Sequence, residues 1–278
     1  MMQFNAKRAS PQCTIVFTDL DGSLLDHTDY SHAAAAPALE RLREQGIPLV
    51  PASSKTAAEI IAFNEQIDNN HPFIFENGGG IGVPRGYFPY FTAGRREGDY
   101  RLHTNGCPYT EIVNCLRSLR DRHGWRFSGF ADWGTDQVMA HTGLTRVAAK
   151  AARQRLLSEP VLWQDGSATL LEFTRQLQEQ NLHLERGGRF LSVQSIVDKG
   201  KAMNQLLRHY TEQYGRPIVT VACGDSPNDR SMLLQADFAV IIPDHLGRHL
   251  QIARNDRVHY ASAPGPTGWR EGIEHFLS

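Results

Sequence analysis

Residues 14–26 of this 278-residue chain read TIVFTDLDGSLLD, and this stretch decides the predicted fold. Its first part, residues 14–18, is apolar and β-branched, which is typical of a strand buried on both faces of a sheet. Asp19 and Asp21 follow directly, and Gly22 allows the chain to turn at once. Ligands of an open α/β sheet bind beyond the carboxyl ends of its strands, so these two carboxylates are the first candidates for chemistry.

Other short apolar runs follow the same pattern. They cover residues 47–50, 72–75, 218–222 and 238–242. Thr56 and Glu59 have the spacing of a capping box, which predicts a helix after the second run. Residues 203–214 carry apolar side chains at helical spacing, and Gly215 ends that pattern. Strands that alternate with helices predict a doubly wound parallel α/β sheet.

The middle of the chain has a different pattern. Helices are predicted at residues 111–122, 145–157 and 168–180, a strand at 125–130, and a hairpin from 182 to 193 that turns at 186–189. Helices combined with antiparallel hairpins suggest a smaller α+β domain. We therefore expect a catalytic core formed by residues 1–89 and 190–278, with residues 90–189 inserted as a separate domain.

The composition excludes several classes of protein. Lys and Arg number 29 and Asp and Glu number 30, so there is no basic excess to bind nucleic acid. No apolar run approaches the roughly 20 residues of a membrane span. The four cysteines form no C-x-x-C pair, and the polar first 11 residues lack the apolar stretch of a signal peptide. We expect a cytoplasmic protein without a nucleic-acid or membrane partner.

Polar side chains collect after the predicted strands. They are Asp19, Asp21, Ser53, Glu76, Asn77, Asp225, Asn228 and Asp229. Clustered carboxylates repel one another unless a cation lies among them, and oxygen-only ligands favour Mg²⁺. A carboxylate beside Mg²⁺ can act as a nucleophile, and a second one nearby can act as general acid and base. Lys199 and Ser53 are candidates to hold the oxygens of a transferring phosphoryl group.

Four short motifs resemble, in their order, those of the haloacid dehalogenase superfamily of phosphatases. The first is DLDGSLLD at residues 19–26, and the second is Ser53 after a strand. The third is Lys199 within DKG, and the fourth is GDSPND at residues 224–229. The insertion falls between the second and third motifs, so the resemblance implies a C2-type cap, as in the Cof-like group of sugar-phosphate phosphatases.

Further stretches, spread from residue 14 to residue 269, resemble the mannosyl-3-phosphoglycerate phosphatase family. They read SSKTAAE at 53–59, ENGG at 76–79, SEP at 158–160, GGRF at 187–190 and GPTGW at 265–269. This resemblance implies a small-molecule substrate, mannosyl-3-phosphoglycerate, which is hydrolysed to phosphate and the compatible solute mannosylglycerate. The glucosyl analogue, glucosyl-3-phosphoglycerate, is the alternative substrate.

The superfamily resemblance also implies roles for individual residues. Asp19 would be the nucleophile that forms an aspartyl phosphate, and Asp21 the general acid and base. The metal ligands would be Asp19, the backbone carbonyl of Asp21, and Asp225. Ser53 and Lys199 would hold the phosphoryl oxygens.

Two groups of supporting residues complete the predicted site. Asn228 and Asp229 would support the metal or orient the motif-three lysine. Arg189 is a candidate to bind the carboxylate of a glycerate substrate through two parallel hydrogen bonds, with Lys55 a candidate of the same kind. The full set of predicted substrate contacts is Lys55, Glu76, Asn77, Gly78, Gly79 and Arg189.

Other functions share part of this pattern. A general sugar-phosphate or sucrose-phosphate phosphatase, or a sugar phosphomutase of the same superfamily, would use the same nucleophile. A phospho-accepting signalling module also pairs acidic residues with Mg²⁺ and a lysine. Such a module needs neither Asp21 nor an inserted domain, so both features count against it.

Overall fold

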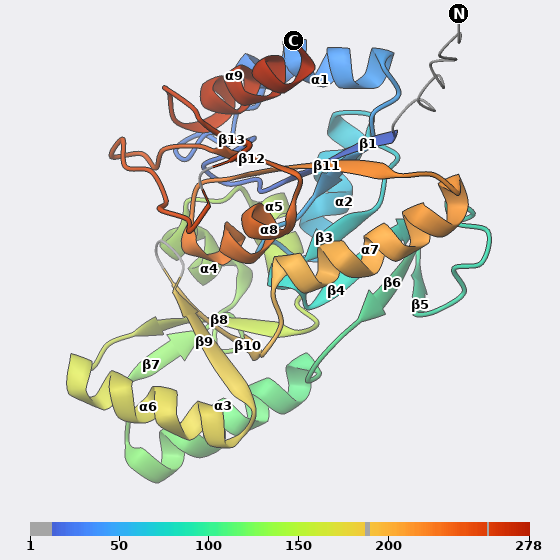
Figure 1. Ribbon diagram of the computed structural model, residues 1–278. Coiled ribbons are helices and arrows are strands. Elements are labelled where there is room, and N and C mark those ends of the chain that lie inside the picture. The colour runs from blue at the N-terminus through green and yellow to red at the C-terminus, as the bar shows by residue number, and fades with distance from the viewer. Residues whose placement is uncertain (1–12, 187–189, 255) are drawn as a thin grey trace, which may run out of the picture.

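The computed structural model describes residues 13–186, 190–254 and 256–278, and its centre is a parallel sheet of five strands (Figure 1). The strand order is β13-β12-β11-β1-β2. The bounds are β1 Cys13–Thr18, β2 Leu49–Pro51, β11 Ile218–Gly224, β12 Phe238–Ile241 and β13 Val258–Tyr260. Every neighbouring pair in this sheet is parallel, so the predicted doubly wound α/β core is confirmed.

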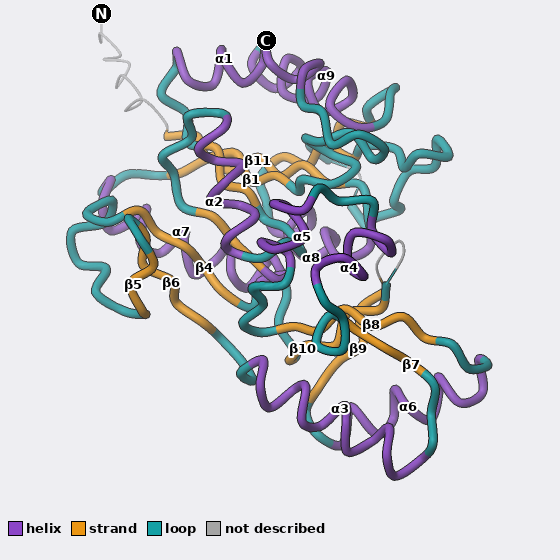
Figure 2. The backbone as a smooth tube through the Cα atoms, turned by 180° about the vertical axis from the view of Figure 1, so that it is seen from behind, coloured by secondary structure: helices purple, strands orange, loops and turns teal. Residues whose placement is uncertain are grey.

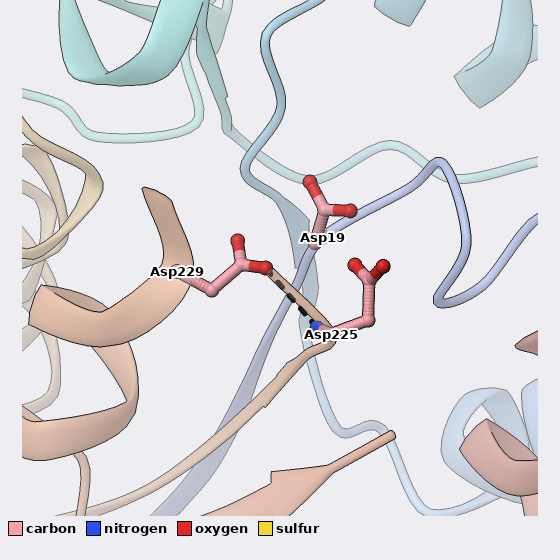
Figure 3. A group of neighbouring side chains, drawn as sticks. All are labelled: Asp19, Asp225 and Asp229. Atoms are coloured by element: carbon pink, nitrogen blue, oxygen red, sulfur yellow. Dashed lines mark hydrogen bonds between the residues drawn. The ribbon is translucent and has the colours of Figure 1, made fainter. Parts of the chain in front are cut away.

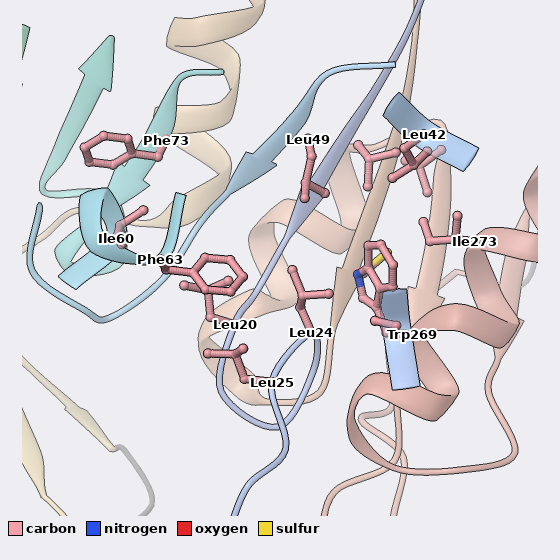
Figure 4. Packing of buried hydrophobic residues seen from close by; sticks show 14 of the residues in the cluster. Leu20, Leu24, Leu25, Leu42, Leu49, Ile60, Phe63, Phe73, Trp269 and Ile273 are labelled. Atoms are coloured by element: carbon pink, nitrogen blue, oxygen red, sulfur yellow. The ribbon is translucent and has the colours of Figure 1, made fainter. Parts of the chain in front are cut away.

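Helices cover both faces of this sheet. On one face Val16 packs with Leu42 and Trp269, which lie on α1 and α9 (Figure 4). On the other face Ile15 and Phe17 pack against α7 and α8. The core helices are α1 Ala36–Glu44, α2 Ala57–Gln66, α7 Lys199–Tyr214, α8 Arg230–Gln235 and α9 Gly265–Leu277, with short 3-10 turns at η1 Ala33–Ala35, η2 Glu76–Gly78 and η3 Pro227–Asp229. Side chains alternate along β1, and therefore one strand contributes to two apolar layers.

The predicted capping box at the start of α2 is present. Thr56 accepts a hydrogen bond from the Glu59 backbone nitrogen, and the Glu59 carboxylate accepts one from the Thr56 backbone nitrogen. The predicted end of α7 is also confirmed, because Gly215 has φ 58° and caps the helix in the left-handed region. The capping box fixes where the loop that carries Ser53 ends, and Gly215 fixes the end of α7, whose first residue is Lys199.

A second, antiparallel sheet extends the core in the order β3-β4-β6-β5. Its strands are β3 Phe73–Phe75, β4 Gly80–Pro84, β5 Arg95–Glu97 and β6 Tyr100–Thr104. The sequence did not predict β4, because its glycines are typical of a loop. The structure explains them: a Cβ at Gly80 or Gly82 would lie 2.2 or 2.1 Å from the ring of the phenylalanine opposite.

A third sheet, in the order β7-β8-β10-β9, is antiparallel and belongs to the inserted part of the chain. Its strands are β7 Phe127–Gly129, β8 Ser158–Trp163, β9 Leu182–Arg186 and β10 Leu191–Ser195. Two helices, α3 Tyr109–His123 and α6 Ser167–Glu179, pack on its face away from the core through Ile112 and Phe173 (Figures 1 and 2). Helices α4 Thr135–Thr142 and α5 Arg146–Ala152 lie between this sheet and the core.

The inserted elements match the sequence pattern only in part. The helices predicted at 111–122 and 168–180 and the hairpin of β9 and β10 are confirmed, while the turn at 187–189 lies outside the described residues. The helix predicted over 145–157 ends at Ala152 instead. Strand β8 begins at Ser158, where no strand was predicted.

The predicted domain boundaries at residues 90 and 189 differ from the strand pairing. Strands β5 and β6 pair within the sheet of β3 and β4, whereas β10 pairs with β8 and β9. We therefore propose that the inserted unit begins after β6 and ends after β10. The two segments that connect this unit to the core, after β6 and at the end of β10, are joined by a hydrogen bond of 2.7 Å from the Cys107 backbone nitrogen to Ser195 Oγ.

Within the described part of the chain, no helix is both long and apolar enough to cross a lipid bilayer.

Candidate active site

Three carboxylates meet at the carboxyl ends of the central strands (Figure 3). Asp19 follows β1, while Asp225 and Asp229 belong to the loop after β11. One carboxylate oxygen from each lies within 4.8 Å of the others. The two strands are tied together at this edge, because the Asp19 backbone nitrogen donates to the Cys223 carbonyl at 2.9 Å. Strand pairing therefore brings together motifs that are more than 200 positions apart in the sequence.

Lys199 is fully buried and lies between two of these carboxylates. Its Nζ donates to Asp19 Oδ1 at 2.5 Å and to Asp229 Oδ1 at 2.6 Å. Lys199 is the first residue of α7, and the Asp198 side chain caps that helix. Burial opposes the charge of Lys199, but attraction to Asp19 and Asp229 outweighs it and raises the pKa of the ammonium group. Lys199 is therefore a permanently charged ammonium group beside the predicted nucleophile.

The remaining negative charge of the cluster is not neutralised by Lys199. Burial, reinforced by Asp229, raises the pKa of Asp19 to about 7 against the opposing effect of Lys199. Burial, with Asp19 and Asp229 as further causes, raises the pKa of Asp225 to about 9. Carboxyl groups in this state gain from a bound cation, and their oxygen-only donor set suits Mg²⁺. The residues present therefore fit the predicted metal site.

Both oxygens of the Asp229 carboxylate are engaged inside the protein. One binds Lys199, and the other accepts hydrogen bonds from the backbone nitrogens of Asp225 at 3.1 Å and Ser226 at 3.0 Å. These contacts fold the 225–229 loop around Asp229 and aim Asp225 at Asp19. The geometry supports Asp229 as an orienting residue for Lys199 and for the loop.

The Asp21 side chain does not belong to this group of three and pairs with Lys55. Its Oδ1 lies 2.9 Å from Nζ of Lys55, which is also 3.9 Å from Glu59 Oε1 and lies over the Tyr30 ring. Gly22 follows with φ 81°, and a Cβ there would lie 2.7 Å from Asp225 Oδ2. A glycine is thus required both for the turn and for the close approach of the two acidic loops.

Ser53 lies two residues beyond Pro51, the last residue of β2 that pairs with β1. The backbone nitrogen of Ala52 donates to the Thr18 carbonyl at 2.7 Å, which places Ser53 beside the loop that begins with Asp19. Ser53 is 1% exposed, and its hydroxyl accepts a hydrogen bond of 3.2 Å from the Lys55 backbone nitrogen. A hydroxyl that accepts one hydrogen bond can still donate its own hydrogen, as the predicted contact with a phosphoryl oxygen requires.

The 76–79 loop is held by contacts within the protein. Glu76 was predicted to contact substrate, but its carboxylate is fully buried and accepts hydrogen bonds from Leu156 N, Leu157 N and Ser158 Oγ at 2.8, 2.9 and 2.6 Å. It therefore joins the core to the segment that begins β8. These three donors satisfy the buried carboxylate and give Glu76 a structural role, while its predicted contact with substrate stays a prediction.

The other members of this loop are also engaged within the protein. A Cβ at Gly78 would lie 2.2 Å from the Asp198 carbonyl oxygen, so this glycine lets the loop pack against the start of α7. The Gly79 carbonyl accepts from Asn105 N at 2.6 Å. The Asn77 amide bonds to Gln194 and Asn228. None of these contacts supports the predicted substrate role. Of the other two candidates, Lys55 lies beside Asp21 and Arg189 lies outside the described residues.

Two residues that shape the site were not predicted as site residues, although one of them, Trp269, belongs to the GPTGW stretch. Trp269 is fully buried and its Nε1 donates to Thr18 Oγ1 at 2.9 Å, while Thr18 Oγ1 donates to the Asp19 carbonyl at 2.7 Å. This relay fixes the end of β1. Arg155 donates to the Ser54 carbonyl at 3.0 Å and so holds the loop of the second motif from the inserted unit.

Two family models match parts of the chain. The haloacid dehalogenase-like hydrolase model matches residues 16–88, and the model of sucrose-6F-phosphate phosphohydrolase matches residues 163–277. Two curated relatives, from Methanococcoides burtonii and Persephonella marina, are each named glucosyl-3-phosphoglycerate/mannosyl-3-phosphoglycerate phosphatase. The first is 35% identical over 260 residues, covering 93% of this chain and 95% of the relative. The second is 32% identical over 265 residues, covering 95% and 97%.

Solved structures have the same fold. Protein 0175 of Thermoplasma acidophilum superposes with a TM-score of 0.66 at 16% identity, covering 96% of this chain and 99% of the other. A haloacid dehalogenase subclass IIB sugar phosphatase, BT4131, gives a TM-score of 0.61 at 16% identity, covering 95% and 99%. At these identities the likeness establishes the haloacid dehalogenase-like fold alone.

Proposed function

We propose that this chain, which belongs to the glucosyl-3-phosphoglycerate/mannosyl-3-phosphoglycerate phosphatase family, hydrolyses mannosyl-3-phosphoglycerate in a Mg²⁺-dependent reaction. Its family makes it a phosphoric monoester hydrolase of the haloacid dehalogenase-like fold. The glucosyl ester is the second candidate substrate, which the dual names of both relatives favour. The observation that carries the proposal is the buried contact of Lys199 with Asp19 beside the acidic cluster. It pairs a nucleophile with a phosphate-binding cation.

In the proposed first step, Asp19 attacks the phosphorus and the bond from phosphorus to O3 of the glycerate breaks. Asp21 gives its proton to O3, so that the leaving group departs as a neutral alcohol. In the second step, Asp21 takes a proton from water while the water oxygen attacks phosphorus. The bond between Asp19 and phosphorus breaks, which restores the carboxylate and releases phosphate. Lys199 and Ser53 bind the phosphoryl oxygens throughout.

The metal would be held by Asp19, the backbone carbonyl of Asp21, and Asp225. When bound, Mg²⁺ would neutralise charge on the transferring phosphoryl group. The raised pKa values of Asp19 and Asp225 support this assignment, because both carboxyls lack sufficient positive charge around them.

Stabilisation by Mg²⁺ is expected to increase with pH. In the folded, metal-free protein the pKa of Asp19 is about 7 and that of Asp225 about 9, against 3.8 for an ordinary aspartate. Because both pKa values are higher in the folded protein than in the unfolded chain, protonation of Asp19 and Asp225 contributes to the free energy of unfolding. This contribution is complete below about pH 4 and is lost as the pH rises through the two folded pKa values. Mg²⁺ must displace these protons, so its affinity rises by up to about tenfold per pH unit for each proton released.

Thermal unfolding with and without Mg²⁺, measured between pH 6 and pH 9, checks this prediction. The increase in Tm caused by Mg²⁺ should be larger at the alkaline end. A pH-independent increase would mean that these carboxyls are not the metal ligands.

Replacing Asp21 with asparagine is expected to trap the phosphoenzyme. With p-nitrophenyl phosphate the leaving group needs no proton, so the first step proceeds, whereas the second step lacks its base. Acid-quenched protein should carry one phosphoryl group per chain, removable by hydroxylamine. A variant that turns over without accumulating phosphoenzyme would remove Asp21 from the role of base.

The position of Lys55 supports a substrate with a carboxylate. In a 3-phosphoglycerate ester, two carbons separate the leaving oxygen O3 from the carboxylate carbon. An acid that touches O3 therefore lies close to that carboxylate, and Lys55 Nζ is only 2.9 Å from Asp21 Oδ1. The Lys55 side chain remains 14% exposed, and attraction to Asp21 and Glu59 overcomes its burial and raises its pKa, so it is charged. It can therefore pair with the glycerate carboxylate.

Replacing Lys55 with methionine is expected to erase the preference for glycerate esters. Loss of one charge-assisted hydrogen bond should lower kcat/KM for mannosyl-3-phosphoglycerate by about 10–100-fold relative to glucose 6-phosphate, which has an alkyl leaving group without a carboxylate. Lys150→Met, at an exposed position on α5, is the matched control. An unchanged ratio between the two substrates would show that Lys55 does not read the carboxylate.

A further inference from the structure

A chain of polar side chains joins the inserted unit to the loop that carries Asp225. Ser226 Oγ donates to Asn228 Oδ1 at 2.5 Å, and Asn228 Nδ2 donates to Asn77 Oδ1 at 3.1 Å. Asn77 Nδ2 then donates to Gln194 Oε1 on β10, also at 3.1 Å. These four residues are called the amide chain below.

The three hydrogen bonds of the amide chain run in one direction. Gln194 and Asn77 are 1% and 4% exposed, so water is a poor substitute for a lost partner. Without the Gln194 carbonyl, the Asn77 NH₂ group would lose its acceptor. Turning the Asn77 amide over would then set its NH₂ group against the NH₂ group of Asn228. A change at Gln194 therefore disturbs each following member of the chain.

The Ser226 end of the amide chain lies against the acidic cluster. Ser226 Oγ is 3.2 Å from Asp229 Oδ2, the same oxygen that accepts from the Asp225 backbone nitrogen. The other Asp229 oxygen binds Lys199. The direction of the hydrogen bonds in the amide chain thus decides whether the Ser226 hydroxyl donates to Asn228 or to Asp229. This choice changes the hydrogen bonding of the loop that presents Asp225.

The Gln194 end lies where the inserted unit joins the core. The next residue, Ser195, accepts the hydrogen bond from Cys107 that joins the two connecting segments. A pocket of about 340 Å³ lies beside the amide chain, with Gln194, Asn77 and Asn228 in its wall. Three members of the amide chain therefore form part of the wall of an open space. Displacement of the inserted unit would move Gln194, because β10 belongs to that unit.

We propose that Gln194 is a positioning residue: through the amide chain, the inserted unit holds the 224–229 loop in the arrangement that presents Asp225. The inference rests on the proposed role of Asp225 in binding Mg²⁺. It goes beyond that role by assigning part of the site's preorganisation to a residue that touches none of the reacting groups.

Two substitutions interrupt the amide chain at different points. Gln194→Met keeps the length of the side chain and removes the acceptor. Asn77→Gly removes the middle link, and glycine suits the φ of 57° at that position. Ser192→Ala is the control, because Ser192 Oγ makes a 3.4 Å hydrogen bond to the same Gln194 oxygen without belonging to the chain. Calorimetry on substrate-free protein gives the dissociation constant for Mg²⁺, and p-nitrophenyl phosphate turnover gives kcat and KM.

Each chain variant is expected to weaken Mg²⁺ binding about tenfold and to lower kcat to a similar extent, with KM within about twofold of the unchanged protein. The double variant should be no worse than Asn77→Gly alone, since the two residues act in series, and Ser192→Ala should match the unchanged protein. The proposal is overturned if the two effects multiply, or if only Tm falls while Mg²⁺ affinity and kcat hold. If the unchanged protein binds no Mg²⁺, the proposed metal role of Asp225 is wrong. The kcat values of the single and double variants then still decide whether the amide chain positions the 224–229 loop.

Discussion

Replacing Asp19 with asparagine is expected to lower kcat for phosphate release by roughly 10⁴-fold or more, because the substitution removes the oxygen that attacks phosphorus. The side chain keeps its size and its place beside Lys199. No other described residue combines a carboxylate at the end of β1 with a direct contact to that lysine. Steady-state phosphate release, measured with saturating substrate and Mg²⁺, checks this prediction.

The same variant should remain folded, which separates chemistry from structure. Asp19 contributes negative charge to a crowded cluster, and burial raises its pKa to about 7. Above that pH, removing the charge should leave the metal-free protein at least as stable as the unchanged one. Circular dichroism and thermal unfolding provide the control. Activity close to that of the unchanged protein would place the nucleophile elsewhere.

Replacing Lys199 with methionine is expected to damage both stability and catalysis. The ammonium group lies 2.5 Å from Asp19 and 2.6 Å from Asp229, and all three groups are buried. Removing one partner of a buried ion pair costs about 3–5 kcal/mol, because the remaining charges stay out of water. Loss of a group that binds the phosphoryl oxygens should lower kcat by roughly 10³-fold. Urea unfolding and steady-state turnover measure the two effects.

The stability loss in Lys199→Met should become smaller as the pH falls. Without the lysine, the two carboxylates lack their main positive neighbour, and protonation relieves their repulsion. Mg²⁺ should recover part of the stability, whereas Lys150→Met on the exposed face of α5 should leave it unchanged. A Lys199→Met protein as stable as the unchanged one at pH 8 would contradict the account of this buried cluster.

The catalytic edge of the fold was predictable from short stretches of sequence. Apolar runs that end in Asp19, Ser53 and Asp225 indicate parallel strands, and the geometry of such a sheet brings their carboxyl ends together. Lys199 precedes a clear helical pattern and is preceded by a capping aspartate, so its place at the start of α7 also follows from local sequence.

Other parts of the fold depend on packing that no local pattern contains. Strand β4 has the composition of a loop, and its glycines are explained only by the phenylalanine rings of β3. Pro160 lies within β8, opposite Ser192, against the usual preference of proline. The inward turn of Glu76 depends on partners about 80 positions away in the sequence. Gln194 is an ordinary strand residue until the fold places Asn77 against it.

We propose above all that this phosphatase acts on glycosyl-3-phosphoglycerates with Mg²⁺. The most direct test is kcat/KM for phosphate release, with and without Mg²⁺, from mannosyl-3-phosphoglycerate, glucosyl-3-phosphoglycerate, sucrose 6-phosphate and simple sugar phosphates. We predict Mg²⁺-dependent hydrolysis with a large preference for one or both glycosyl-3-phosphoglycerates. Comparable, weak rates across all of these esters, or rates that do not change when Mg²⁺ is removed, would contradict it.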